Sequence, residues 1–359
     1  MQKKELIGVS VQEMEAVVAS LGEPRFRAGQ LFHALYHERQ LDLQQITTLP
    51  VRLRKRLEMG FQATLPTMGK KFTSTDGTSR YLLLLADGKE IETVLMPEPD
   101  RDTICISTQA GCAVDCKFCL TGVLGFQRNL EPGEIVGQVL LLIRENGLRT
   151  KKAGADEAEP RRLNLVFMGM GEPLLNYENT MEAVKLLSDP EGMALSVAHM
   201  TLSTSGVVPG IKRLGAEPVR PKLAISLNAT IDEQRSRIMP INRKWPIAEL
   251  LKACREFPLG SRERLTFEYV LLDGVNDSLE DAARLARLIR PLHAKVNLIG
   301  LNPGAELPYS TPPQERVLSF QKVLINNGVA AFIRKPRGRD IFAACGQLKL
   351  INLPVPALS

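Results

Sequence analysis

Residues 111–119 read Gly-Cys-Ala-Val-Asp-Cys-Lys-Phe-Cys, which places Cys112, Cys116 and Cys119 in a C-x3-C-x2-C spacing. So short a segment can wrap one compact metal centre with each thiolate pointing inward. In a cytosolic chain of this size, clustered cysteines bind metals or act in catalysis more often than they form disulfides. Three interpretations compete: a zinc site with Cys105 as fourth ligand, a disulfide that leaves one cysteine over, or a four-iron, four-sulfur cluster with one iron open to an outside ligand.

Beyond these cysteines, apolar runs of strand length alternate with helical patterns. Strands are expected at 103–108, 163–170, 199–205, 222–228, 264–272, 293–302 and 330–335, and helices at 132–145, 178–188, 247–256, 279–290 and 313–326. This alternation indicates an α/β fold with a parallel sheet and crossover helices. Because six or so units are too few for an eight-stranded barrel, we expect an incomplete, curved barrel. A doubly wound open sheet remains the alternative.

The segment before the cysteines follows other patterns. Residues 1–60 are expected to be helical, since 27–39 places apolar side chains along one stripe at helical spacing. Further on, two extended runs flank Asp87-Gly88, which is a strong signal for a β-hairpin. The predicted division is a small N-terminal helical domain with the hairpin at 1–96, a core at 97–349 and a tail at 350–359.

The composition of the 359-residue chain, with 44% hydrophobic and 24% charged residues, is close to the average of soluble globular proteins. It excludes a disordered chain, a collagen and a coiled coil, and the apolar runs are too short to span a bilayer. We therefore expect a soluble, cytoplasmic protein. The net charge is +6, and basic runs at 52–56 and 334–339 favour a polyanionic partner, although each run alone is typical of a solvated face.

Small and hydrogen-bonding residues recur where the expected strands end. Functional groups of such barrels gather at the C-terminal ends of the strands, so this coincidence indicates a site for a polar ligand. Each residue alone could be a strand-ending turn. The candidate binding residues are Gly171, Glu172, Ser203, Ser226, Leu227, Asn228 and Asn302.

The cysteine motif, with an aromatic residue before its last cysteine, resembles that of the radical S-adenosylmethionine (SAM) superfamily. The resemblance implies a 4Fe-4S cluster held by Cys112, Cys116 and Cys119, and a partial (β/α)6 TIM-like barrel around it. It also implies that SAM binds at the open iron and is reduced to release a 5′-deoxyadenosyl radical. Gly171-Glu172 resembles the superfamily motif that binds the amino group of SAM.

A second resemblance covers nearly the whole chain. Asp-Ile-Phe-Ala-Ala-Cys-Gly-Gln-Leu at 340–348, with Gly-Glu-Pro-Leu-Leu-Asn at 171–176 and the upstream Cys105, resembles the RlmN/Cfr family of RNA methyltransferases. Pro173 favours the RlmN branch.

In that family, the positions of Ser203, Ser226 and Asn302 hold the ribose, carboxylate and adenine of SAM. Asn228 departs from the common pattern, in which a histidine often follows Ser-Leu. We therefore expect its contact to SAM to survive with a changed hydrogen-bond partner.

The resemblance implies methylation of carbon 2 of adenine by two cysteines. Cys345 takes a methyl group from one SAM, and the radical from a second SAM abstracts hydrogen from that methyl group. The carbon radical adds to adenine and forms a protein–RNA adduct. After the C2 proton is lost, Cys105 forms a disulfide with Cys345 and releases the methylated base. Glu92 matches the family's proton acceptor.

The partners that the resemblance implies are 23S rRNA, tRNA and an electron donor such as flavodoxin, with no membrane and a monomeric protein. Two alternatives stay open at this point. One is methylation at carbon 8 of adenine, as in Cfr. The other is a zinc-stabilised RNA-binding protein without catalysis.

Overall fold

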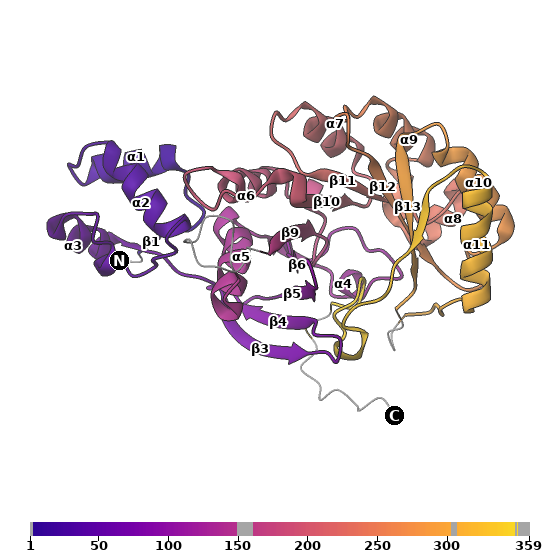
Figure 1. Cartoon of the computed structure of the whole chain (residues 1–359), viewed down its shortest axis with the longest axis horizontal. Helices are drawn as coiled ribbons and strands as arrows, with labels where there is room; N and C mark the ends of the chain where they lie inside the picture. Colours follow the sequence, from indigo (N-terminus) through magenta and orange to yellow (C-terminus); the bar gives the residue numbers. More distant parts are fainter. Residues whose placement is uncertain (1–2, 149–160, 303–306, 349, 351–359) are drawn as a thin grey trace.

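The computed structural model describes residues 3–148, 161–302, 307–348 and 350. Its centre is a ten-stranded sheet in the order β14-β13-β12-β11-β10-β9-β6-β5-β4-β3 (Figure 1). The parallel strands are β6 (Arg101–Cys105), β9 (Arg162–Phe167), β10 (Met200–Thr204), β11 (Lys222–Ser226), β12 (Leu265–Leu271), β13 (Ala294–Gly300) and β14 (Ala331–Ile333). From β6 to β14 their spatial order follows the chain without reversal, whereas a doubly wound sheet reverses direction. The expected α/β fold, a partial barrel of parallel strands with crossover helices, is therefore confirmed over the doubly wound alternative.

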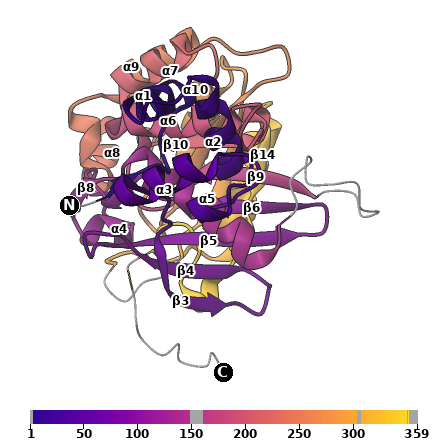
Figure 2. The ribbon, with the colours of Figure 1, turned by 90° about the vertical axis from the view of Figure 1, so that its left-hand side faces the viewer.

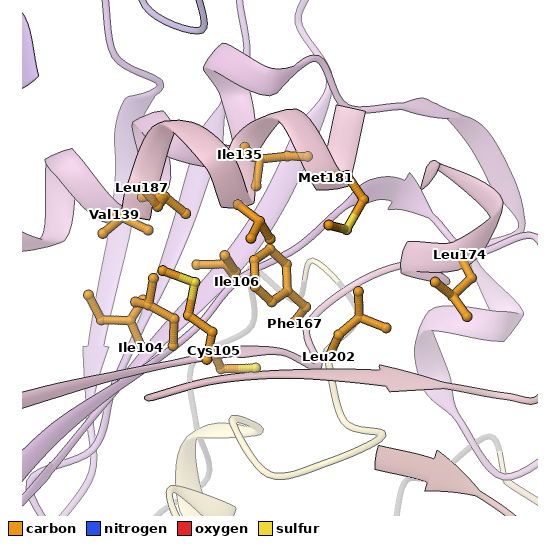
Figure 3. Packing of buried hydrophobic residues seen from close by; sticks show 14 of the residues in the cluster. Ile104, Cys105, Ile106, Ile135, Val139, Phe167, Leu174, Met181, Leu187 and Leu202 are labelled. Carbon is orange, nitrogen blue, oxygen red and sulfur yellow. The ribbon is translucent and has the colours of Figure 1, made fainter. Parts of the chain in front are cut away.

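Helices connect the parallel strands and cover one face of the sheet. They are α5 (Pro132–Asn146), α6 (Tyr177–Ser188), α7 (Val208–Ala216), α8 (Asp232–Ile238), α9 (Ile247–Glu256), α10 (Leu279–Ile289) and α11 (Gln314–Asn326). Ile135 of α5 and Met181 of α6 pack with Ile106 and Phe167 of the β6 and β9 region in one buried cluster (Figure 3). This apolar packing fixes the strands whose ends carry the candidate residues.

The sequence analysis missed α7 and α8. In α7, Pro209 and Gly210 obscure the helical pattern. However, proline is favoured in the first turn of a helix. Gly210 allows α7 to approach its neighbour closely, because a Cβ atom there would lie 2.7 Å from Cβ of Leu174. Pro209 and Gly210 are therefore compatible with α7, although they weaken the helical pattern in the sequence.

The N-terminal residues are helical, as expected. They form β1 (Lys4–Glu5), α1 (Val11–Ser20), α2 (Phe26–Tyr36), η1 (Leu43–Gln45), α3 (Val51–Gly60) and β2 (Phe61–Gln62). These helices lie at one end of the molecule beside α5 and α6, as Figures 1 and 2 show. Within this unit, the Tyr36 hydroxyl accepts from the Gly8 amide at 2.8 Å and donates to the Val9 carbonyl at 3.2 Å.

The predicted hairpin is confirmed as β4 (Ser79–Leu84) and β5 (Glu90–Glu98). Its turn contains Gly88 with φ of +80°, a conformation that favours glycine. The sequence analysis missed β3 (Thr67–Thr73), which pairs with β4 and is almost wholly exposed. Because β5 pairs antiparallel with β6, these three strands extend the core sheet. The division at 96/97 stays a prediction, and nearly all of the predicted tail at 350–359 lies outside the described residues.

Shorter elements complete the fold around the sheet: β7 (Gln109–Gly111), α4 (Leu120–Val123), β8 (Phe126–Asn129), η2 (Pro173–Leu175), η3 (Val197–His199), η4 (Pro240–Arg243) and η5 (Arg339–Ile341). Across the described residues, each helix is too short or too polar to cross a membrane.

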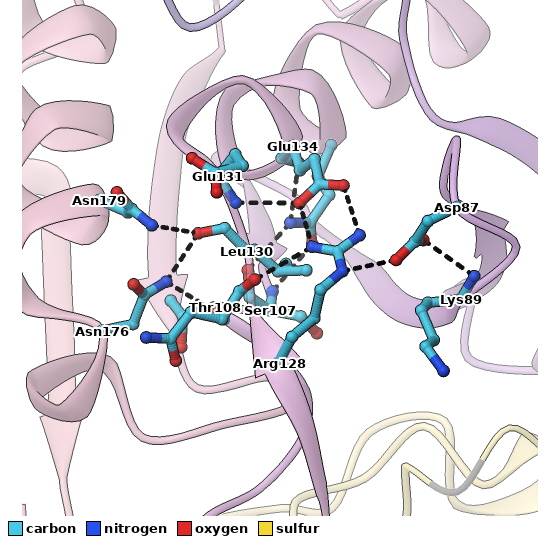
Figure 4. A network of polar contacts seen from close by, with 12 residues as sticks. Asp87, Lys89, Ser107, Thr108, Arg128, Leu130, Glu131, Glu134, Asn176 and Asn179 are labelled. Atoms are coloured by element: carbon cyan, nitrogen blue, oxygen red, sulfur yellow. Dashed lines mark hydrogen bonds and ion pairs between the residues drawn. The ribbon is translucent and has the colours of Figure 1, made fainter.

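Arg128 of β8 connects the hairpin turn to α5 (Figure 4). Its guanidinium makes a bidentate pair with Glu134 at 2.7 and 2.8 Å, and its Nε donates to Asp87 at 2.7 Å. The hydrogen bond from Arg128 is the main reason that the pKa of the Asp87 carboxyl falls to about 2, and the charge of Arg128 adds to this effect. One side chain therefore ties the strand after the cysteine motif to two neighbouring elements.

Ser107, just after β6, joins three elements around the sheet. Its hydroxyl donates to the Glu92 carbonyl at 2.6 Å and accepts from the Met170 amide at 2.8 Å. The Gln138 side chain of α5 bonds both the amide and the carbonyl of Ser107, at 2.8 and 2.9 Å. This buried residue therefore sets the spacing between β5, α5 and the loop after β9.

The N-terminal unit contacts α5 through two glycines, and this contact yields a prediction. A Cβ atom on Gly133 would lie 2.1 Å from the Ile7 carbonyl oxygen. We expect Gly133→Ala to lower the free energy of unfolding by about 1–3 kcal/mol, the usual cost of overpacking. Thermal denaturation measures the loss. Gly29→Ala is the matched control, because its Cβ atom meets nothing within 4 Å and alanine favours the helix. Equal stability of both variants would contradict the prediction.

Candidate active site

An open cavity lies at the C-terminal ends of the parallel strands. The structure brings together most of the candidate residues on its walls. These are Cys112, Cys116, Cys119, Gly171, Glu172, Ser203, Ser226, Asn228, Asn302 and Cys345. Three candidates lie off these walls: Cys105 and Glu92 are buried in the strands beside the cavity, and the Leu227 side chain is fully buried in the core.

The cysteine loop is held by its backbone. Gly111 has φ of +75°, and a Cβ atom there would lie 1.8 Å from the Gly125 carbonyl oxygen, so only glycine fits. The Cys112 amide donates to that same carbonyl at 3.0 Å. The Lys117 amide donates to the Ile238 carbonyl of α8 at 2.9 Å. The loop is therefore fixed at both ends before any ligand binds.

Burial makes two of the motif thiols, those of Cys112 and Cys116, poor acids. It raises the pKa of Cys112 to about 12 and that of Cys116 well above its ordinary value, and the neighbouring sulfurs add to both rises. Thiolates at these positions therefore need a cationic ligand, since a bound metal deprotonates its cysteines.

Cys112, Cys116 and Cys119 all line the same cavity, so their sulfurs could hold one inorganic group between them. Thiolate sulfur is the ligand that both iron–sulfur clusters and zinc prefer. Among the described residues, no three His, Cys, Asp or Glu side chains form a site for a single metal ion.

Glu172 is buried in the cavity wall, and its carboxylate has defined partners. One oxygen accepts from the amide and hydroxyl of Ser205 at 2.6 and 2.7 Å, and the other accepts from the Leu174 amide at 3.1 Å. Burial raises its pKa, while these hydrogen bonds oppose the rise. Gly171 before it has φ of +102°, and a Cβ atom there would lie 2.6 Å from Cβ of Gln109. The pair therefore shapes the wall where an ammonium group could be held.

The asparagines in the wall have structural contacts of their own. Asn228 has φ of +57°, and its Oδ1 accepts from the Val270 amide at 2.8 Å. Its Nδ2 donates to Sδ of Met239 at 3.2 Å, so the side chain is already engaged. Asn302 donates to the Cys345 carbonyl at 3.2 Å and thereby anchors the C-terminal segment over the cavity.

Cys105 and Cys345 are far apart in the sequence, but the fold brings their thiols near each other. Cys345 is exposed to the cavity, but protein surrounds its other sides, and this burial raises its pKa to about 11 with a contribution from Glu268. Cys105 is buried at the end of β6, and burial, followed by the effect of Cys345, raises its pKa. The two thiols are free and close enough to interact electrostatically.

Glu92 lies on β5, on the same face of the sheet as Cys105. Cys105 pairs with Val94, and Arg80 of β4 also pairs with Val94, so these side chains and Glu92 share one face. A glutamate on a hairpin strand usually faces solvent, yet Glu92 is fully buried and forms an ion pair with the equally buried Arg80. The ring of Phe72 lies under the guanidinium, 4.4 Å from it.

Comparison with known proteins assigns the family. Residues 106–286 match the radical SAM superfamily, and residues 4–62 match the ribosomal RNA large subunit methyltransferase N-terminal domain. A probable dual-specificity RNA methyltransferase RlmN of Koribacter versatilis is 52% identical, with 93% of this chain and 98% of that protein aligned. The chain belongs to the RlmN family of radical SAM RNA methyltransferases. A similar RlmN of Anaeromyxobacter sp. is 50% identical over 96% of this chain and 90% of its own.

A solved structure supports the RlmN-family fold. The crystal structure of a radical SAM methyltransferase from Sphaerobacter thermophilus has a TM-score of 0.89 and 45% identity, covering 96% of this chain and 99% of that one. Membership in the radical SAM superfamily implies a 4Fe-4S cluster and SAM, and the donor set described above fits both.

The sequence analysis of this RlmN-family chain missed Glu268, a polar group in the cavity wall. Its side chain points inward from β12 and accepts from Asn297 of β13 at 2.9 Å. Burial raises its pKa. The alternation of Leu265–Leu271 places Glu268 opposite the buried apolar face, where a polar residue is ordinary, so the sequence carries no signal for it.

The Arg80–Glu92 pair gives a prediction about stability. Removing one member of a buried ion pair leaves the other charge uncompensated, so we expect Arg80→Met to lower the free energy of unfolding by about 3–5 kcal/mol. Chemical denaturation checks this. Arg101→Met is the matched control, since its pair with Glu98 is about one-third exposed and should contribute less than about 1 kcal/mol. Similar losses in both variants would show that burial does not decide the effect.

Proposed function

We propose that this chain methylates carbon 2 of adenine in 23S rRNA and tRNA, with Cys345 as the methyl carrier. The observation that carries the proposal is the position of Cys345 in the cavity that the three motif cysteines and the candidate SAM residues also line. A carrier thiol must reach both SAM and the base, and this position allows both. The RlmN relatives, named as dual-specificity RNA methyltransferases, support the choice of substrates.

Cys112, Cys116 and Cys119 would hold the cluster, and Gly171, Glu172, Ser203, Ser226 and Asn302 would hold SAM. A bound cluster supplies the electron that cleaves SAM to a 5′-deoxyadenosyl radical. That electron must come from outside the chain, and we propose a protein donor such as flavodoxin. The monomeric state and the cytoplasmic location stay predictions.

Residues of the chain itself would carry out the transfer of the carbon, the release of the product and the removal of the proton. The Cys345 sulfur would carry the carbon. The Cys105 sulfur would then bond to the Cys345 sulfur as the bond between the Cys345 sulfur and the carbon breaks, and the one surplus electron would leave these residues when the C2 proton is lost. Asn302 and the Gly346 carbonyl, which accepts from the Leu120 amide at 2.7 Å, orient the carrier segment. Glu92 would accept the C2 proton, and its carboxylate is held in place by the ion pair with Arg80.

RNA would contact the exposed part of the C-terminal basic run. Lys335 and Arg339 are exposed, whereas Arg337 bonds the carbonyls of Pro97 at 2.8 Å and Asp76 at 3.3 Å and pairs with the Asp76 carboxylate. The polyanion contact of the 334–339 run stays a prediction, and we leave Arg337 out of the proposed contact. Arg337 instead anchors this loop to the β3–β4 turn, because its donors are taken by protein oxygens.

The N-terminal basic run is also partly structural. Arg54 donates to the Gln44 carbonyl, and Arg56 donates to the Leu21 carbonyl. Only Arg52 and Lys55 of this run are fully exposed. An RNA contact of the N-terminal unit would therefore rely on these two residues.

Product analysis tests the proposed function. Protein reconstituted with iron and sulfide is incubated without oxygen with SAM, a reductant and deproteinised rRNA. We expect 2-methyladenosine in the digested RNA by mass spectrometry. 8-Methyladenosine as the only product would replace the proposed regiochemistry. A colourless, iron-free protein that binds RNA without modifying it would support the zinc-stabilised alternative instead.

Replacement of Cys345 and replacement of Cys105 should block different steps of the reaction. We expect Cys345→Ala to abolish the S-methylated protein, because no other thiol receives the methyl group. Cys105→Ala should keep that methylation and trap the protein–RNA adduct, visible as a shifted band on a denaturing gel. Cys254→Ala is the control, since this buried thiol packs in the core away from the cavity. Product at the wild-type rate from either active-site variant would contradict the scheme.

The basic residues should differ in their effect on RNA binding. We expect Lys335→Gln with Arg339→Gln to make the dependence of log affinity on log salt concentration shallower by about 1–2, as lost phosphate contacts do. Arg337→Gln should lower thermal stability, because it removes an anchor between two segments. An unchanged salt slope in the double variant would assign both residues to a solvated face.

A further inference from the structure

Arg235 of α8 is a fully buried cation beside the active site. Its guanidinium donates to the carbonyls of Ser205, Leu227 and Ser226 at 2.6, 2.9 and 3.0 Å, and to the Asn242 side-chain oxygen at 3.0 Å. Every acceptor is uncharged. No ion pair in the described part of the chain includes Arg235.

A buried charge without an opposite charge is costly, so its retention needs a reason. Burial lowers the pKa of Arg235 to about 10, which still leaves the side chain charged at neutral pH. The carboxylate of Asp232 on the same helix is engaged elsewhere, with the Asn242 amide and the Ile247 amide at 2.9 Å each. The protein therefore maintains inside the fold a positive charge that Asp232 attracts electrostatically but does not contact in an ion pair.

This charge lies next to the cysteine loop. Ile238 is the last residue of the helix that carries Arg235. Its carbonyl accepts a hydrogen bond of 2.9 Å from the amide of Lys117, which lies between Cys116 and Cys119. The carbonyls that Arg235 binds belong to Ser205 and Ser226, at the ends of the strands that form the cavity wall.

We propose that Arg235 is the buried counter-charge of the iron–sulfur site and raises the reduction potential of the cluster. It is a positioning residue, because it acts through the cysteine loop and does not line the cavity. Three thiolates carry negative charge into this site, and reduction by one electron adds another. A fixed cation stabilises the reduced state more than the oxidised state, and its effect is strong because water is excluded.

The test measures the midpoint reduction potential of the reconstituted cluster by dithionite titration followed by electron paramagnetic resonance. Arg235→Gln removes the charge but keeps amide donors for the carbonyls, and Arg235→Lys keeps the charge. We expect a lower potential for Arg235→Gln and a value near the wild type for Arg235→Lys. Arg237→Gln is the matched control, because it makes the same charge change on an exposed position of the same helix.

Each outcome has a defined meaning. If Arg235→Gln keeps its circular dichroism spectrum but loses iron while Arg235→Lys retains it, the counter-charge role is also supported. Equal potentials for Arg235→Gln and Arg237→Gln would overturn the inference, as would equal loss of fold or iron in both Arg235 variants. The inference rests on the cluster of the proposed function, and wild-type protein that binds no iron would defeat that function separately.

Discussion

Hydrogen bonds between the segment after Cys119 and the segment around Cys345 hold the two halves of the active site together. The Leu120 amide donates to the Gly346 carbonyl at 2.7 Å, and the Thr121 hydroxyl donates to the Leu348 carbonyl at 2.8 Å. A flexible C-terminal segment would rarely bring its thiol to the cavity, whereas these contacts fix it there in advance. Such pre-organisation lowers the entropic cost of each transfer step.

Much of the core could be predicted from the sequence because its signals are local. Strand-length apolar runs alternating with helices specify a parallel sheet, and Asp87-Gly88 specifies a tight turn whatever surrounds it. The cysteine spacing is equally local, since three ligands within eight residues must share one loop. The candidate residues at strand ends converge because parallel strands all end at the same side of the sheet.

Other features depend on contacts between distant residues, and no local pattern contains them. The exposed strand β3 lacks an apolar stripe and exists because β4 offers it an edge. Arg337 belongs to a basic run, but Asp76 and Pro97 determine its role. The burial of Arg235 likewise follows from strand ends that only the folded sheet brings around it. Charge is visible in a sequence, whereas its solvation is a property of the fold.

The Ser107 hydroxyl, which bonds the Glu92 carbonyl and the Met170 amide, has a wider consequence. It fixes the separation between β5, which carries Glu92, and the loop that leads to Gly171. Since a single hydroxyl joins them, a shift of either segment would be passed to the other, and the acid and the cavity wall keep a constant separation.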